Sequence, residues 1–370
     1  MLKICTGGYG AGSSQQDLTY IINENGNNFV GVTIQYRLGA FGFMSSDEIH
    51  RKGVSNAGIL DQNFALKWVQ TYIHLFGGDQ TQVTISGESA GGGSVMLQTM
   101  AYGGSLGTSL FQNSFASSPY LPQQYGYADW VPSQSYYAFA LYAGCWGGTA
   151  YGYETQPQGI FECLTTKDTM LLQNASFYVS ASANYGIWGF LPVTDNIIIQ
   201  DVPSRQLAQK RVNGLRMLAG NNAEEGAPFV PQNITTEADL LSWLQVTFPL
   251  FGNSDLAKTL LYYSSSNASV KSNADEYATN GLTGNTANNE SVVATGLQQT
   301  ANNIYAETTF VCPAYWLAEA FSNPPRVSYK YQYSVIPALH GSDVAGFFGP
   351  TSPQQGPEFG KAFMRKFHAH

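Results

Sequence analysis

The chain has 370 residues, a net charge of −8 at neutral pH and only 11% charged residues. So few lysines and arginines leave no basic stripe to neutralise phosphates, which argues against DNA or RNA binding. No apolar run reaches the length of about 18 residues that a transmembrane helix needs. The apolar fraction of 44% instead indicates a globular protein with a large core.

The first predicted elements alternate between strands and helices. Residues 28–43 begin with an apolar, β-branched run, which indicates a strand buried on both faces. Residues 56–78 carry apolar side chains at helical spacing and end in two glycines, the pattern of a helix and its stop. Those apolar residues are Leu60, Phe64, Trp68 and Ile73. A strand at 81–86 and a helix at 90–100 follow, and this order predicts parallel strands joined by right-handed crossovers.

The second half of the chain contains insertions and two further strands. Residues 120–300 are rich in Tyr, Asn and Ser, and we expect them to cap the sheet. Helices are expected at 135–144, 237–247 and 254–263, and strands near 216–229 and 326–335. No repeat and no linker separates two cores, so we expect one domain over residues 1–370 with a doubly wound α/β fold.

The stretch 83–95, VTISGESAGGGSV, carries the first chemical signal. A buried strand runs directly into Gly87-Glu88-Ser89-Ala90-Gly91 and then into a glycine-rich helix. This is the G-x-S-x-G pattern in a strand–turn–helix context, which places the serine exposed at the tip of a sharp turn. Ser89 is therefore the candidate nucleophile.

A serine hydroxyl needs an imidazole to take its proton, and the imidazole needs a carboxylate to hold its tautomer. In the α/β-hydrolase chain order the acid and then the histidine follow the serine. His50 and His74 precede Ser89, and His368 and His370 lie in a tail. His340 follows a predicted strand and precedes a glycine, so it is the candidate base.

The acid is less sharply indicated by the residues themselves. Glu225 lies on a loop after a predicted strand, directly before Gly226. Glu224 is its main rival, and Asp195 and Asp343 are weaker ones.

Taken together, these stretches resemble a known family. The segments VTIQYRLGAFGF, NAGILDQNFALKWVQ, VTISGESAGGGSV, AGNNAEEGAPF and ALHGSDVAGFFG are similar to the type-B carboxylesterase, cholinesterase and fungal lipase family. The amino-acid sequence is most similar to those of secreted esterases of filamentous fungi. The resemblance implies an α/β-hydrolase fold, a mostly parallel sheet flanked by helices, with Ser89 as nucleophile, Glu225 as acid and His340 as base.

The resemblance also implies an oxyanion hole. One backbone N–H comes from the residue after the nucleophile, here Ala90. The others match Gly7 and Gly8, although Cys5 and Thr6 stand where the family usually has an aromatic residue or histidine and another glycine. Arg37 and Asp61 match an ion pair of the family with a structural role.

Glycosylation sequons and a pair of cysteines favour a secreted protein. Asn-x-Ser/Thr sequons lie at Asn174, Asn233, Asn267 and Asn289. Cys145 and Cys163 bound a loop rich in Gly, Tyr and Gln, and a disulfide there would contribute ~3 kcal/mol. Cys312 is expected to be a buried free thiol. The first residues lack the apolar segment of a signal peptide, so the extracellular location rests on the resemblance.

The predicted activity is hydrolysis of small-molecule or lipid carboxylic esters, without cofactor or metal. A lipase acting on longer acylglycerols is one alternative, and a non-catalytic cholinesterase-like protein is another. Compared with the family pattern, we expect the chain to be incomplete at both ends and its sheet to lack edge strands. That expectation adds an inactive truncated protein as a third alternative.

Overall fold

The computed structural model describes residues 1–4, 7–147, 159–263, 293–349 and 357–366. Its centre is a sheet in the order β2-β1-β3-β4-β5-β6, in which all neighbouring strands pair in parallel. The strands are β1 (Leu2–Ile4), β2 (Val32–Ile34), β3 (Thr84–Glu88), β4 (Asn113–Ser117), β5 (Arg216–Asn222) and β6 (Val327–Tyr333). The doubly wound α/β prediction is therefore confirmed.

Helices form the connections between these strands. They are α1 (Thr19–Glu24), α2 (Gly39–Phe43), α3 (Asp47–Lys52), α4 (Ala57–Tyr72), α5 (Ala90–Met100), α6 (Trp130–Tyr142), α7 (Gly159–Thr165), α8 (Thr169–Ala181), α9 (Pro203–Ala208), α10 (Glu237–Thr247), α11 (Asn253–Tyr262), α12 (Gly296–Ala306), α13 (Cys312–Ala320), α14 (Val344–Phe348) and α15 (Pro357–Lys366). Shorter turns are η1 (Ile73–Phe76), η2 (Ala101–Gly104), η3 (Ala227–Phe229) and the π-helical η4 (Glu307–Val311).

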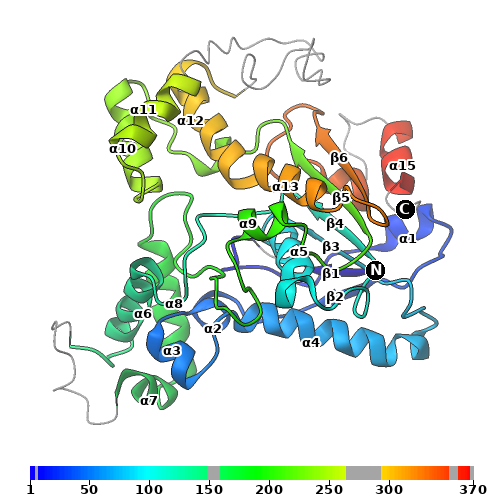
Figure 1. Ribbon diagram of the computed structural model, residues 1–370, viewed down its shortest axis with the longest axis horizontal. Helices are drawn as coiled ribbons and strands as arrows, with labels where there is room; N and C mark the ends of the chain where they lie inside the picture. The colour runs from blue at the N-terminus through cyan, green and yellow to red at the C-terminus, as the bar shows by residue number, and fades with distance from the viewer. Residues whose placement is uncertain (5–6, 148–158, 264–292, 350–356, 367–370) are drawn as a thin grey trace.

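Helices cover both faces of the sheet (Figure 1). On one face α5 packs on β1, β3 and β4, and α13 packs on β5 and β6. Because successive side chains of a strand point to opposite faces, β4 serves both layers. Ala116 faces the larger core, whereas Phe115 packs with Phe347 and Phe348 of α14 and with Ile21 of α1.

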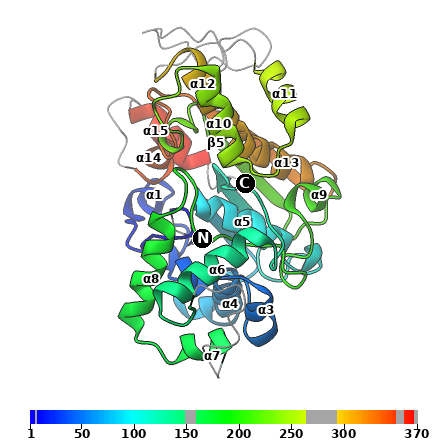
Figure 2. The same ribbon diagram turned by 90° about the vertical axis from the view of Figure 1, so that its left-hand side faces the viewer.

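The insertions form two groups of helices at opposite ends of the molecule (Figure 2). Helices α6, α7 and α8 gather at one end, and α10, α11 and α12 at the other, in both views. The structure pairs Cys145 with Cys163 in a disulfide, which links the end of α6 to α7 as the sequence predicts. Cys312 carries a free thiol at the start of α13, but it is half-buried rather than buried.

The apolar spacing that indicated the helix at 56–78 marks its buried face only in part, since Ile73 is buried and Leu60 packs against the core. Phe64 is 71% exposed and Trp68 is 40% exposed. The buried face instead includes Leu66 and the amides of Gln62 and Asn63. Those amides donate to side chains of α5, at 2.9 Å to Ser94 and 3.1 Å to Gln98, so α4 and α5 share polar as well as apolar contacts.

Two further expectations concern the surface. Arg37 and Asp61 form a two-pronged ion pair, with N–O distances of 2.7 and 2.8 Å, that ties the segment after β2 to α4. The candidate glycosylation residues Asn174 and Asn233 are exposed, as an acceptor must be. Asn267 and Asn289 lie outside the described residues.

Candidate active site

Ser89 lies on a strained turn between β3 and α5. Its backbone has φ 58° and ψ −124°, a conformation that costs a non-glycine residue roughly 1–3 kcal/mol. The turn is so tight that a Cβ on Gly87 would lie 2.3 Å from the backbone of Gly91. This close approach is the physical reason for glycines on both sides of the serine in the G-x-S-x-G pattern.

The structure brings Ser89, His340 and Glu225 into one hydrogen-bonded row. His340 Nε2 lies 2.8 Å from Ser89 Oγ, and His340 Nδ1 lies 2.5 Å from Glu225 Oε2. The three residues come from the end of β3, the loop after β5 and the loop after β6. All three loops are at the carboxyl edge of the sheet, where ligands bind in open α/β sheets.

Donors surround the Glu225 carboxylate, which is fully buried. Ser118 Oγ and the Asn222 backbone N–H each donate to Oε1 at 2.5 Å, and Asn222 Nδ2 donates at 3.2 Å. Burial alone would raise the pKa of Glu225, but His340 and these donors outweigh burial and hold it below its ordinary value. Glu225 is therefore an acceptor for the imidazole N–H.

The rival acids face other partners. Glu224 accepts from Gln299 Nε2 at 3.1 Å, and Asp195 accepts from the backbone N–H groups of Ile197 and Ile199 at 2.9 Å. Asp343 is buried beside the row but accepts from Ser117 and Tyr331, not from His340.

The other histidines are placed away from Ser89 or are not described. His50 stacks on Tyr127 with ring centroids 3.9 Å apart. His74 is exposed on η1, and His368 and His370 lie outside the described residues.

A second carboxylate, that of Glu88, contacts His340, the candidate base. The sequence patterns did not indicate this contact. Its Oε1 lies 3.3 Å from His340 Nε2. Burial, with smaller effects of Asp343 and Glu225, raises the pKa of Glu88 to about 7 although His340 opposes that rise. Burial would lower the pKa of His340, but Glu225 and Glu88 raise it to about 9. The available signal was the position of Glu88, directly before the serine of the motif.

Of the expected oxyanion donors, Gly7 and Gly8 line a pocket with Ser89, and Ala90 follows Ser89 in the chain. Ala90 is the first residue of α5, where helical N–H groups have no acceptor within the helix. Gly8 has φ +57°, and a Cβ there would lie 1.7 Å from the ring of Trp188, so only glycine fits. The Gly7 N–H donates to the Ala11 carbonyl at 2.7 Å and must leave that bond before it can donate to an oxyanion.

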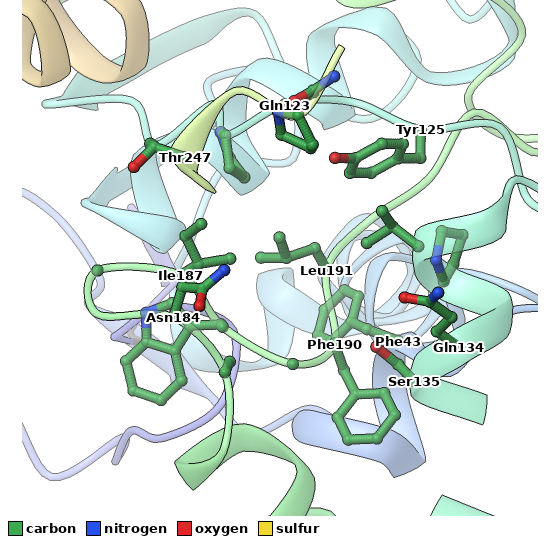
Figure 3. A pocket seen from close by; sticks show the side chains of 18 of the residues that line it. Phe43, Gln123, Tyr125, Gln134, Ser135, Asn184, Ile187, Phe190, Leu191 and Thr247 are labelled. Atoms are coloured by element: carbon green, nitrogen blue, oxygen red, sulfur yellow. The ribbon is translucent and has the colours of Figure 1, made fainter. Parts of the chain in front are cut away.

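Two cavities meet at Trp188 and Tyr120. The candidate catalytic pocket, of about 450 Å³, is lined by Ser89, His340, Glu88, Gly7, Gly8, Tyr120, Trp188, Phe229, Gly341 and Val344. A neighbouring cavity of about 400 Å³ has more apolar than polar surface, with Ile187 and Leu191 pointing into it and the polar Gln123 and Tyr125 on another wall (Figure 3). Trp188 and Tyr120 line both cavities.

Within the described residues, no group of three or more His, Cys, Asp or Glu side chains is arranged to hold a metal ion. In that same part of the chain, every helix is too short or too polar to cross a bilayer.

The chain is similar to fungal esterases and lipases. The chain is 30% identical over 338 residues to carboxylesterase patB of Aspergillus clavatus, covering 89% of the chain and 53% of the relative. It is 34% identical over 267 residues to lipase 2 of Geotrichum candidum, covering 69% and 46%. Several other relatives are named secreted lipases. The chain thus spans about half the length of the curated relatives it matches.

A solved structure shares the fold. The crystal structure of EstA of Aspergillus niger matches with a TM-score of 0.77 and 25% identity, covering 95% of this chain and 65% of EstA. The family model described as carboxylesterase family matches residues 1–360. The protein therefore belongs to the carboxylesterase family.

Proposed function

We propose that the protein hydrolyses carboxylic esters through an acyl-enzyme on Ser89. The observation that carries this proposal is the continuous row from Ser89 Oγ through His340 to Glu225, which opens on a pocket. His340 takes the hydroxyl proton as Oγ attacks the ester carbonyl, and Glu225 stabilises the imidazolium that forms. His340 then returns the proton to the departing alcohol.

Water completes the cycle. His340 takes a proton from the water molecule that attacks the acyl carbon, and the proton returns to Ser89 as the carboxylic acid leaves. During both attacks the carbonyl oxygen becomes negative, and the N–H groups of Gly8 and Ala90, with Gly7 after its rearrangement, are the donors we assign to it. No step requires a cofactor or metal.

The proposal also covers where the protein acts and which acyl chain length its substrates have. The exposed sequons, the disulfide and the secreted relatives support an extracellular protein. A lipase acting on longer acyl chains is the second candidate, and the apolar cavity beyond Trp188 is the observation that favours it. Trp188 lines both that cavity and the catalytic pocket, and we propose that its ring keeps a long acyl chain out of the cavity, so we favour short acyl esters.

Hydrolysis of p-nitrophenyl acetate, butyrate and palmitate by the wild type and by Ser89→Ala tests the proposal. We expect turnover of the acetate and butyrate esters, and at least about a thousandfold loss of kcat in the variant. A soluble, cooperatively folded wild type without turnover would point to a non-catalytic member of the family. Preference for the palmitate ester would favour the lipase.

A further inference from the structure

Two carboxylates, not one, are fully buried behind His340. Glu225 contacts the imidazole, whereas Asp343 has no part in the proposed chemistry. Asp343 lies three residues after His340, at the end of the same loop and directly before α14. Burying a carboxylate costs free energy unless hydrogen-bond donors compensate it. The donors that contact Asp343 therefore indicate its role.

The end of β4 supplies one donor to each carboxylate. Ser117 Oγ donates to Asp343 Oδ2 at 2.5 Å, and the next residue, Ser118, donates to Glu225 Oε1 at 2.5 Å. Tyr331 of β6 adds a further bond to Asp343 Oδ2 at 2.7 Å. The last residue of β4 and the residue directly after it thus hold both acids in place.

Asn222, the last residue of β5, joins the two acids directly. Its Nδ2 lies 3.2 Å from Glu225 Oε1 and 3.2 Å from Asp343 Oδ1. Its Oδ1 accepts from the Asp343 backbone N–H at 3.1 Å, and its own backbone N–H donates to Glu225. Two amide hydrogens and one amide oxygen fit this set of partners, whereas an aspartate at this position would place a third carboxylate between two others.

We propose that Asp343, acting through Asn222, is a positioning residue for the His340–Glu225 pair. Asn222 fixes the Glu225 carboxylate in the orientation that meets Nδ1, and Asp343 anchors both Asn222 and the loop that carries His340. The negative charge of Asp343 also favours the protonated imidazole. This inference rests on the proposed function only in that the pair is the one assigned to ester hydrolysis.

The electrostatic part of the proposal depends on every charged group around the pair. Glu225, Glu88 and Asp343 all raise the pKa of His340 against the effect of burial. The charge of Glu225 raises the pKa of Lys330 on β6 against the effect of burial, and Lys3 on β1 lowers the pKa of Glu88. Tyr331, which also faces Asp343, has its pKa raised well above the ordinary value by burial and by Asp343. Asp343→Asn removes one negative charge from this set of groups and keeps the shape of the side chain.

A variant pair separates positioning from stability. Asp343→Asn is compared with Asp195→Asn, which also alters a buried, hydrogen-bonded aspartate but one that accepts from Ile197, Ile199 and Asn56. The readouts are the pH profile of kcat/KM and an NMR titration of the His340 ring, including the resonance of its Nδ1 proton. The spectrum of His340→Gln assigns the signal.

For Asp343→Asn we expect kcat on the alkaline plateau to fall about tenfold with KM little changed. An effect of this size is typical when a residue that orients a functional group is lost. The acid limb of kcat/KM and the NMR midpoint of His340 both move to lower pH, because a negative charge near the imidazolium is lost. Asp195→Asn lowers the melting temperature without moving either midpoint. Asp343→Glu, which restores the charge, moves the NMR midpoint back toward the wild-type value.

Unchanged NMR midpoints in folded Asp343→Asn would overturn the proposal, as would equal shifts in both variants. If Asp343→Asn does not fold, Ser117→Ala keeps the carboxylate charge but removes one donor that holds it, and a shift of the His340 Nδ1 proton resonance is required of it. The NMR titration needs no turnover. A wild type without esterase activity would therefore refute the proposed function while the positioning proposal is still decided.

Discussion

The catalytic pocket and the cavity beyond Trp188 have similar volumes, about 450 and 400 Å³, but different construction. Loops at the ends of β3, β5 and β6 build the first, and short hydrogen bonds hold its reactive groups. The second is built in part by α6, α8 and the segment 184–193, and its surface is more apolar than polar. Changes in the pocket should therefore alter the chemistry, and changes at the wall should alter substrate preference.

The largest effect is expected at the acid of the hydrogen-bonded row. Glu225→Gln removes the charge that stabilises the His340 imidazolium, so kcat should fall at least about a thousandfold. The matched control is Glu224→Gln, because Glu224 is also buried but its described side-chain contact is with Gln299. Steady-state kinetics on folded proteins would contradict the assignment if the two variants lost activity equally.

A smaller effect is expected where the two cavities meet. Trp188→Ala removes the ring that lines both, so a long acyl chain gains access to the apolar cavity. The ratio of palmitate to acetate turnover should rise roughly tenfold, the effect of burying about two more CH₂ groups at about 0.8 kcal/mol each. Trp130→Ala, which alters the second cavity alone, is the control. An unchanged ratio in Trp188→Ala would show that the tryptophan is not the barrier.

The next prediction concerns pH and the second carboxylate at His340. Glu88 raises the pKa of His340, so Glu88→Gln should lower that pKa and move the acid limb of kcat/KM to lower pH. Activity below the wild-type midpoint then increases relative to the plateau, because more of the imidazole is in its basic, neutral form. A limb that stays in place would mean that Glu88 has no influence on the base.

The smallest effect tests the surface of α4, outside both cavities. Phe64→Ser should change the free energy of unfolding by no more than about 0.5 kcal/mol, because the ring is 71% exposed. Leu66→Ala, two residues later and fully buried, should cost about 2–5 kcal/mol. Chemical denaturation measures both. A large loss in Phe64→Ser would show that this ring is covered in solution.

Local patterns predicted the parts of the fold that depend on short segments. The helix after Ser89 and helix 237–247 lie where the sequence indicates, and the strand before Ser89 runs over 84–88 rather than 81–86. The spacing of Phe64 and Trp68 gave the correct element but not its buried face, because polar amides of Gln62 and Asn63 pack against α5.

The site was only partly predictable because its groups meet through tertiary contacts. The G-x-S-x-G motif indicated Ser89 and chain order indicated His340, but Glu224 and Glu225 are neighbours with the same chemistry. Their different partners, Gln299 and His340, distinguish them. The bridge from Asn222 to Asp343 joins residues 121 positions apart, so no local pattern contains it. Trp188 likewise reaches Gly8 from a distant insertion.

Covalent labelling tests the central claim most directly. The wild type is incubated with diethyl p-nitrophenyl phosphate, and mass spectrometry of the digested protein locates the diethylphosphoryl group. We predict a single adduct on Ser89, formed slowly or not at all in His340→Gln. A folded protein that remains unlabelled at Ser89, or that reacts at another residue while Ser89 stays free, would contradict it.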